Sequence, residues 1–428
     1  MSAYPRVLLG AYQCAPGEGL ESELGWQWYR RLAARTSTTL VTLVRNRGAL
    51  EDAGSPSTGS DVVYIDTELF AGPWYRKVSE MFQNSDRAKA LLRMLDFYVY
   101  DHAMVRGLEE RRDDWDVVHA VTPVSPLAAT QLHKLELPLV LGPWNGGLTI
   151  PSNVRRTTRN HLSWLPPLHH FAKLYDGIIG STRNADVVLS ATRATTKSIA
   201  ARYRERCVQM LDNGVDLTVF EAKAWPEAPS ADNPLRVCFA GSLIPEKAVN
   251  LLLHAVQRMR EKFPIEAHIV GDGPLHAELE RCAHDLRVND IVTFHGTLPP
   301  ARVAGQLQAA HLTCLPSVSE SSGAVVLETM ACARPSVVVN HGGRSELVKF
   351  DVGVDLRPKN EETIVAGLCK TFADVVRRPH IWRERGETAR RRAERHYSWD
   401  YKISAALGVY LGLRRRRTAP GFVRLSRA

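Results

Sequence analysis

The sequence predicts an α/β protein in which two doubly wound domains, each a parallel sheet with helices on both faces, face a cleft. First, its 428 residues are about three times the usual length of one domain, so two domains are expected. Second, short β-branched runs alternate with helical patterns, which is typical of parallel sheets covered on both faces. Third, the alternation stops at the polar, proline-containing stretch 221–234 and then restarts.

Strand candidates in the first domain are rich in Val, Leu, Ile and Thr. They lie at Val7–Ala11, Thr38–Val44, Val62–Ile65, Val117–Ala120, Leu137–Leu141, Val187–Ser190 and Val208–Leu211. Those of the second domain lie at Arg236–Ala240, Ala267–Val270, Ile291–Phe294, Leu312–Leu315 and Ser336–Val339, with helical patterns at 248–263, 275–285 and 324–333. After Val354 the sequence predicts helix and is rich in arginine to its end.

These patterns set the expected domain boundaries. An N-terminal domain is expected at 1–220, a linker at 221–235 and a C-terminal domain at 236–397. Residues 398–428 are expected to form a helix that crosses back to the N-terminal domain and ends in a basic tail.

Composition excludes several classes of protein. No run of about 18 apolar residues is present, and the start of the chain lacks the long apolar region of a signal peptide, so a cytoplasmic protein is expected. The seven cysteines are scattered without a C-x-x-C pair, which favours reduced thiols over disulfides. The 15 histidines show no ligand spacing, so neither a metal nor another bound cofactor is expected.

The net charge of +9 is concentrated in a few segments. These are Arg155, Arg156 and Arg159 beside Trp164, the run Arg390–Arg392, and Arg414–Arg417. Because the first of them mixes cations with large apolar residues, an anionic membrane face at the cytoplasmic side is one interpretation, and an ordinary solvated surface is the other. No nucleic-acid recognition motif accompanies the charge, so nucleic acid is not expected as a partner.

The strongest functional signal is the segment Leu315–Val339. A strand-like run leads into a loop of small residues and then a helix, with Glu320 before the turn and Glu328 inside the helix. Free amides at such a helix start bind anions such as a diphosphate, and the two carboxylates can accept hydrogen bonds from sugar and ribose hydroxyls. The residues around this start are Ser321, Ser322, Gly323 and Ala324. The alternative is an ordinary strand, turn and helix with two solvated glutamates.

The first strand of the second domain is followed by Gly241, Ser242 and, after a short turn, Lys247. A lysine placed there can swing over the helix start and neutralise a diphosphate leaving group. The sequence contains neither G-x-G-x-x-G nor a P-loop, so the usual motifs for binding a nicotinamide dinucleotide or ATP are absent from it.

Residues that follow strands of the first domain are further candidates, because ligands of open α/β sheets bind beyond the carboxyl ends of the strands. Gly17 and Gly19 permit close backbone approach after the first strand, although such a turn is often only structural. His119 follows Val117 and Val118, where an imidazole either meets a sugar hydroxyl or lies satisfied in the core. The loop after the fifth strand, with Trp144, Asn145 and Gly146, is expected on the acceptor side of the cleft.

Taken together, these residues resemble the retaining GT-B glycosyltransferases whose donor domain carries the E-x7-E motif (glycosyltransferase family 4-like, group 1). The resemblance covers most of the chain. Its landmarks are Glu320 to Glu328 with Pro335, and the segments DNGVDLTVF at 212–220, IVGDGPL at 269–275, FHGTL at 294–298 and NHGGRSELV at 340–348. First-domain segments such as CAPGEGLESELGW also resemble a bacterial branch associated with cell-surface polysaccharide assembly.

The resemblance implies two Rossmann-like domains and the transfer of a hexose-type sugar from a nucleotide diphosphate sugar to a hydroxyl, with retention and without a metal. Glu320 would contact the donor sugar and Glu328 the ribose. The amides of Gly323 and Ala324 and the charge of Lys247 would bind the diphosphate. Further implied contacts are His119 near the anomeric centre, backbone near Gly296 and Leu298 around the base, and the Gly17–Gly19 loop over the phosphates.

Several positions depart from the family pattern. Ser242 stands where an arginine is usual, Ala248 where a glycine is usual and Ser322 where an aromatic residue is usual. The pair Ala333 and Arg334 replaces the glycine often found before the proline. Because Ser242 brings no charge to the diphosphate, Arg334 or Arg344 is the candidate to supply it. Two other functions therefore stay open: a nucleotide-sugar epimerase of the same fold, and a degenerate subunit that only binds a glycan.

Overall fold

The computed structural model describes residues 4–54, 61–68, 72–73, 77, 86–126, 128–146, 175–317, 323–339, 344–349, 351–357 and 359–418, with backbone alone for 86–91, 344–345 and 416–418. These residues form two compact units. The first contains the described residues up to 146, residues 175–212 and residues 403–418, and the second contains 213–402. The chain therefore leaves the first unit after Asp212 and rejoins it after Lys402.

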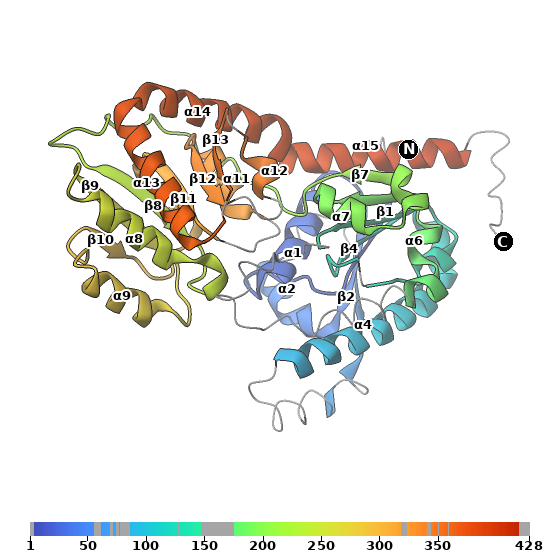
Figure 1. The fold of residues 1–428 in the computed structure, drawn as a ribbon. Helices are drawn as coiled ribbons and strands as arrows, with labels where there is room; N and C mark the ends of the chain where they lie inside the picture. Colours follow the sequence, from blue (N-terminus) through green and yellow to red (C-terminus); the bar gives the residue numbers. More distant parts are fainter. Residues whose placement is uncertain are drawn as a thin grey trace. The chain divides into compact units, whose positions relative to one another are not determined.

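A parallel sheet of seven strands forms the centre of the first unit (Figure 1). Its strands are β1 (Val7–Ala11), β2 (Thr38–Leu43), β3 (Asp61–Ile65), β4 (Val117–Thr122), β5 (Leu139–Trp144), β6 (Val187–Ser190) and β7 (Cys207–Gln209). The spatial order is β3-β2-β1-β4-β5-β6-β7, so the strand order reverses between β1 and β4. All seven strand predictions are confirmed, with ends shifted by a few residues.

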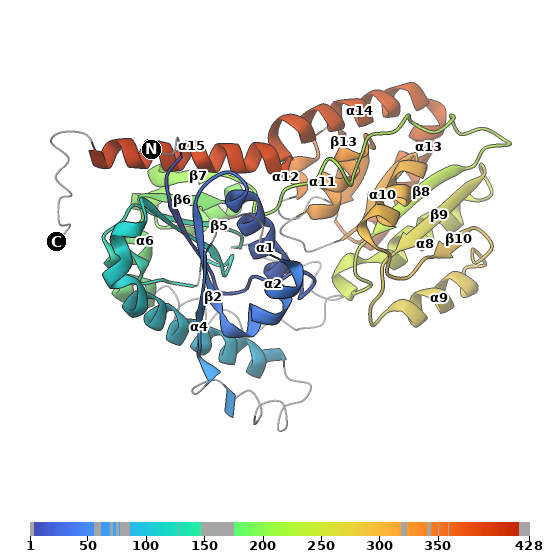
Figure 2. The ribbon, with the colours of Figure 1, turned by 180° about the vertical axis from the view of Figure 1, so that it is seen from behind.

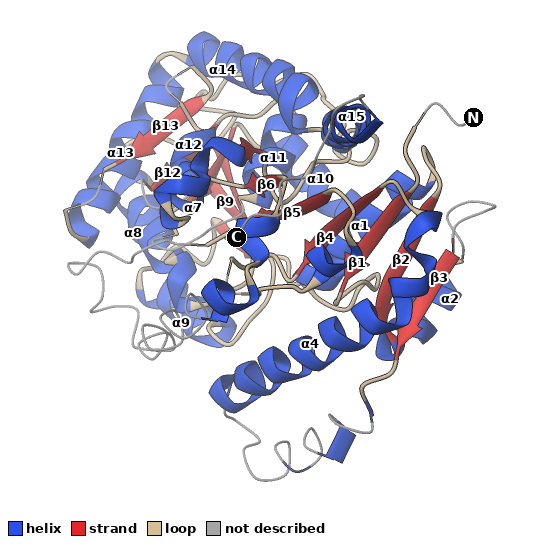
Figure 3. Cartoon of the chain, turned by 90° about the vertical axis from the view of Figure 1, so that its right-hand side faces the viewer, coloured by secondary structure: helices blue, strands red, loops and turns tan. Residues whose placement is uncertain are grey.

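Helices cover both faces of this sheet (Figures 1 and 3). They are α1 (Leu20–Ala33), α2 (Arg47–Ala53), α4 (Asp86–Leu108), α6 (Ser181–Asn184), α7 (Arg193–Ser198) and the part of α15 (Trp399–Thr418) that belongs to this unit. That part buries Ile403, Leu407 and Tyr410 at helical spacing, so α15 packs by one apolar stripe.

The second unit contains a parallel sheet of six strands in the order β10-β9-β8-β11-β12-β13. They are β8 (Leu235–Ala240), β9 (Ile265–Val270), β10 (Val292–Phe294), β11 (Leu312–Leu315), β12 (Ser336–Val339) and β13 (Gly353–Leu356). The first five match the prediction. The expectation that only helix follows Val354 is wrong, because β13 pairs with β12 as the edge strand.

Helices on both faces of this second sheet complete the doubly wound fold (Figure 2). They are α8 (Val249–Met259), α9 (His276–Asp285), α10 (Pro300–Ala309), α11 (Ala324–Ala331), α12 (Arg344–Leu347), α13 (Glu361–Arg377) and α14 (Pro379–Arg392). The stretch 221–234 contains no helix or strand and lies within the second unit.

Candidate functional site

The second sheet reverses its strand order between β8 and β11, which are paired in parallel through Val237 and Leu312. In open α/β sheets a ligand binds at such a switch point, in the crevice beyond the carboxyl ends of the two strands. The loop after β8 carries Gly241 to Lys247, and the segment after β11 leads to α11. The structure therefore brings both predicted diphosphate-binding elements to the same edge of one sheet.

Lys247 ends a short 3-10 turn after β8 and is half-buried. Its Cε lies 3.9 Å from the position that a β-carbon on Gly241 would take, so the side chain folds back over the glycine turn. Ser242 is exposed beside it. Ala248, at φ 49°, precedes α8 in the left-handed conformation, which explains why a glycine suits this position.

The N-terminus of α11 begins at Gly323, which is buried and left-handed at φ 61°. No described side chain caps this end, and the first turn carries no acidic residue. The amides at Ala324 therefore present the positive end of the helix dipole. The predicted contacts Glu320, Ser321 and Ser322 lie outside the described residues.

Glu328 is the fifth residue of α11 and is half-buried. Burial raises the pKa of its carboxyl group to about 7. The carboxylate makes no hydrogen bond or ion pair with any described residue. A ligand that donates hydroxyl hydrogens to it would stabilise the ionised form.

Gly296 and Leu298 follow β10, at the outer edge of the second sheet. Gly296 is left-handed at φ 63°, and its carbonyl oxygen accepts from the Gly271 amide at 2.8 Å. Leu298 is half-buried. Neither residue contributes a charged group, so any ligand contact there relies on backbone atoms.

Gly17 and Gly19 form the exposed turn between β1 and α1, at φ 76° and 98°. A β-carbon on either would meet no atom within 4 Å, so the turn requires glycine for its conformation and not for space. The Gly17 amide donates to Glu23 at 3.0 Å. In the same first turn of α1, the half-buried Glu21 accepts from the Val124 amide at 2.7 Å and thus ties the start of α1 to the loop after β4.

His119 lies inside β4 and is fully buried, so the expectation that it ends the strand is wrong. Its Nε2 lies 2.6 Å from the carbonyl oxygen of Gly142, which can only accept, so Nε2 carries the proton. Nδ1 then accepts from the Tyr410 hydroxyl at 2.6 Å, and burial lowers the pKa of the ring to about 4. Because both nitrogens are occupied by protein, the structure favours the core alternative for His119.

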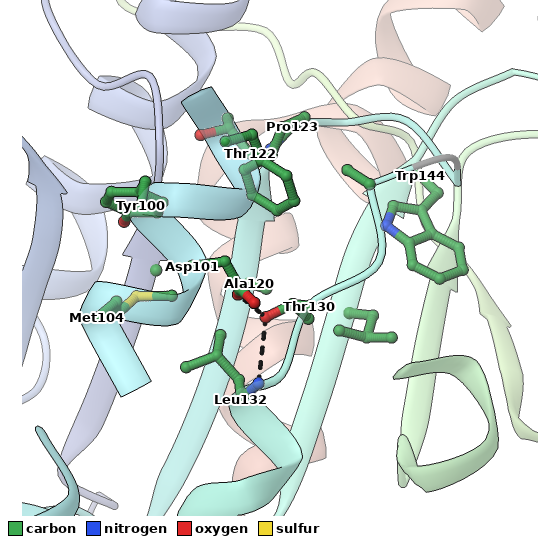
Figure 4. A pocket seen from close by; sticks show the side chains of 13 residues that line it. Tyr100, Asp101, Met104, Ala120, Thr122, Pro123, Thr130, Leu132 and Trp144 are labelled. Carbon is green, nitrogen blue, oxygen red and sulfur yellow. Dashed lines mark hydrogen bonds between the residues drawn. The ribbon is translucent and has the colours of Figure 1, made fainter. Parts of the chain in front are cut away.

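Trp144 is buried at the end of β5 and lines a cavity beneath α4 (Figure 4). Asp101 also lines it, accepting from the Thr130 hydroxyl and from the Gln131 amide at 2.8 Å. Burial raises the pKa of the Asp101 carboxyl to about 6. Since Asp101 is satisfied and the other lining residues are largely apolar, this cavity is part of the core, and Trp144 is not an exposed acceptor contact.

Asn145 and Gly146 follow Trp144 and are half-buried. The Asn145 side chain donates to Asp212 at 2.8 Å, and the Gly146 amide and carbonyl both bond to the Thr195 hydroxyl at 3.2 and 2.9 Å. Asp212 was not expected at the site. The only sequence signal for it is its place at the start of DNGVDLTVF.

Arg334 does not replace the charge missing at Ser242. It is completely buried, and its guanidinium donates to six carbonyl oxygens. These belong to Ala310, Lys223, Cys332, Ala333, Ala224 and Gln308. Arg334 therefore fastens the stretch after residue 220 to the ends of α10 and α11. The Arg344 side chain, the other suggested replacement, lies outside the described residues.

Two further features concern partners. Within the described ranges, no group of three or more His, Cys, Asp or Glu side chains is placed to hold a metal ion. No helix in that same part of the chain is both long and apolar enough to cross a bilayer. Arg155, Arg156, Arg159 and Trp164 lie outside the described residues.

Comparison with known proteins extends these observations. Residues 222–389 match the family described as Glycosyl transferases group 1. An uncharacterized glycosyltransferase of Methanocaldococcus jannaschii is 26% identical over 241 residues, 54% of this chain and 61% of the relative. The D-inositol 3-phosphate glycosyltransferase of Gordonia bronchialis is 34% identical over 189 residues, 42% of this chain and 40% of the relative. The match thus spans less than two thirds of either relative.

A longer match is to the MMP alpha-(1->4)-mannosyltransferase of Mycolicibacterium hassiacum, at 26% identity over 71% of this chain and 72% of that protein. Among solved structures, HepE of Anabaena in complex with UDP superposes with a TM-score of 0.62 at 15% identity, over 95% of this chain and 99% of its own. WaaG, a glycosyltransferase involved in lipopolysaccharide biosynthesis, gives 0.59 at 15% identity, over 95% and 100%. Residues 222–389 are therefore similar to the group 1 glycosyl transferases, and the chain has the two-domain GT-B fold.

Proposed function

We propose that this chain is a retaining, metal-independent glycosyltransferase that moves a hexose-type sugar from a nucleotide diphosphate sugar to a hydroxyl of a glycan or lipid-linked acceptor. The observation that carries the proposal is the arrangement around α11. An uncapped helix N-terminus at Gly323 and the folded-back Lys247 flank one switch point, and Glu328 follows on the same helix without a described partner.

Each donor group has a candidate partner in this arrangement. The diphosphate is held by the amides of Gly323 and Ala324 and by the charge of Lys247. The ribose hydroxyls donate to Glu328, and Glu320 contacts the sugar. Backbone atoms near Gly296 and Leu298 read the base. HepE has been solved with UDP and with UDP-glucose, which supports a nucleotide-sugar donor for a chain of the same fold.

Retention is explained by front-face attack. The bond from the anomeric carbon to the diphosphate oxygen breaks, and the bond from that carbon to the acceptor oxygen forms on the same face. The acceptor proton moves to the departing phosphate oxygen, so no protein base is required. Lys247 and the α11 amides stabilise the charge that develops on the diphosphate, and the buried His119 takes no part.

A cell-surface role is a further part of the proposal. WaaG, a structural neighbour, is involved in lipopolysaccharide biosynthesis, and α15 ends in arginines from Arg414 onward. Such a cluster binds anionic lipid headgroups, which would hold a cytoplasmic enzyme at the inner membrane face. Deleting the chain from Arg414 should reduce sedimentation with phosphatidylglycerol vesicles, and equal sedimentation would contradict this part.

A thermal-shift screen tests the donor site. The screen adds UDP, GDP, ADP and their sugar conjugates to the wild type, to Glu328→Gln and to Glu362→Gln. Glu362→Gln is the control, because it changes an exposed glutamate of α13 that pairs with Arg258. One class of nucleotide should raise the midpoint of the wild type and the control, but less that of Glu328→Gln. No shift with any nucleotide favours the glycan-binding subunit, and donor turnover without an acceptor favours the epimerase.

A further inference from the structure

Asn145, which is half-buried, and Asp212, which is buried, form a polar pair at the carboxyl ends of two strands of the first sheet. Asn145 directly follows β5, and Asp212 lies three residues after the end of β7. Asn145 Nδ2 donates to Asp212 Oδ2 at 2.8 Å. The other oxygen of each side chain, Oδ1, is buried and has no hydrogen-bond partner in the described part of the chain.

The hydrogen bond between the two side chains determines whether the unpartnered atoms are hydrogen-bond donors or acceptors. If the Asn145 amide were rotated by 180°, its oxygen would face a carboxylate oxygen, and two acceptors would repel each other. Both free atoms are therefore acceptors. A buried carboxylate with a single hydrogen bond is costly, and a group that donates hydrogens to the pair removes that cost.

Neighbouring backbone holds the pair in place. The Asn145 amide donates to the Val124 carbonyl at 2.7 Å, in the loop after β4. Gly146 is bonded to the Thr195 hydroxyl of α7 through both its amide and its carbonyl. Asp212 is only 5% exposed. The pair is thus fixed at the edge where ligands of open parallel sheets bind.

We propose that Asn145 and Asp212 bind hydroxyl groups of the sugar acceptor, and this inference rests on the proposed glycosyltransferase function. The chemistry selects the ligand: two acceptor oxygens, one of them charged, fit adjacent hydroxyls of a neutral sugar and repel a phosphate or carboxylate. Both oxygens are covered by protein atoms, so the acceptor reaches them only with a local movement of the covering chain. The alternative is a water molecule that bridges both oxygens as part of the core.

The test uses Asp212→Asn in the full-length chain. An amide at 212 can still accept from Asn145 Nδ2, but it has no charge and replaces the unpartnered carboxylate oxygen by an NH2 group, so the pair loses its charged acceptor. We expect an unchanged or raised melting temperature, a KM for the acceptor at least tenfold higher, and a kcat at saturating acceptor within about threefold of the wild type. A purely structural pair would leave the acceptor KM unchanged.

Transfer is measured from UDP-glucose and GDP-mannose to octyl glucoside, octyl mannoside and glucose 6-phosphate. The control is Asp186→Asn, which removes a carboxylate that accepts from the Leu139 amide at the opposite end of β5. Asn145→Ala is the second variant, in case Asp212→Asn does not fold, and it should also raise the acceptor KM. Wild-type KM values in both variants, or preference for glucose 6-phosphate, would overturn the inference. No transfer by the wild type to any acceptor would instead contradict the proposed function, and the inference with it.

Discussion

The two units of this protein both carry polar side chains that are fully or partly buried, but they differ in how these side chains are satisfied. In the first unit, both nitrogens of His119 are bonded to Gly142 and Tyr410, and no capacity remains for a ligand. In the second, Glu328 has no described partner, and burial raises its pKa to about 7. The difference indicates that unused hydrogen-bonding capacity, and not position along a strand, marks a candidate site.

The same contrast appears within the first unit. Asp101 is buried, but both of its oxygens accept hydrogen bonds from Thr130 and Gln131, so it fixes local structure. Asp212 is equally buried and keeps one oxygen without a described partner. Experiments on His119 and Glu328 test whether this comparison separates structural from functional groups.

The largest expected effect is on folding. His119→Ala should lower the free energy of unfolding by about 3–5 kcal/mol, because it opens a cavity and leaves the Gly142 carbonyl and the Tyr410 hydroxyl buried without partners. Urea denaturation measures this loss. Tyr410→Phe, which removes one of the two bonds, should cost about 1–2 kcal/mol. If His119→Ala kept full stability but lost sugar transfer, His119 would be an active-site residue and not a structural one.

Acid should destabilise the folded protein through the two hydrogen bonds of His119. The pKa of His119 is about 4 in the folded protein and about 6.5 in the unfolded chain, so between these values the unfolded chain binds more protons. The neutral His119 ring therefore contributes about 3 kcal/mol to the free energy of unfolding above pH 6.5, and this contribution is lost as the pH falls to 4. Denaturation of the wild type and His119→Asn at pH 7 and 4.5 measures it. An equal loss in both proteins would contradict the assignment.

Donor binding should change by a smaller free energy. Glu328→Ala should weaken binding of the nucleotide-sugar donor by about 1–3 kcal/mol, because charge-assisted hydrogen bonds to the ribose are lost. Isothermal titration measures the affinity, with Glu362→Gln as the control for loss of a charge on the same unit. Equal affinities in all three proteins would remove Glu328 from the site.

The smallest effect concerns backbone strain. Ala248 is left-handed at φ 49°, so Ala248→Gly should stabilise the protein by about 1 kcal/mol. A thermal melt detects the change. A lower melting temperature would show that flexibility gained in the unfolded chain outweighs the relieved strain.

The sequence alone predicted most of the fold, because buried parallel strands such as β1 and β6 are short runs rich in Val and Leu. The edge strand β13 escaped prediction, since GVDL contains Gly and Asp, which are rare in strands. Sequence patterns also indicated the candidate site at α11, whose proposed residues lie close together along the chain. They could not reveal the partner of His119, because Tyr410 is 291 positions away.

Arg334 illustrates the same limit. As a lone arginine after α11 it could be read as a phosphate ligand, and only the fold shows that six carbonyl oxygens converge on it from three segments. Asp212 was overlooked for a related reason, since its pairing with Asn145 joins residues 67 positions apart. Satisfaction of polar groups is a property of the folded chain.

Proton release on donor binding is the sharpest test of the proposed donor site at Glu328. Glu328, with a pKa of about 7, is about half protonated at pH 7, and ribose hydroxyls favour its ionised form, so binding should release up to about half a proton. Titration calorimetry of UDP into the wild type and Glu328→Gln, in two buffers of different ionisation enthalpy, measures this release. We expect release by the wild type and none by Glu328→Gln. Equal release by both proteins, or tight binding of UDP without release by either, would contradict the proposed site.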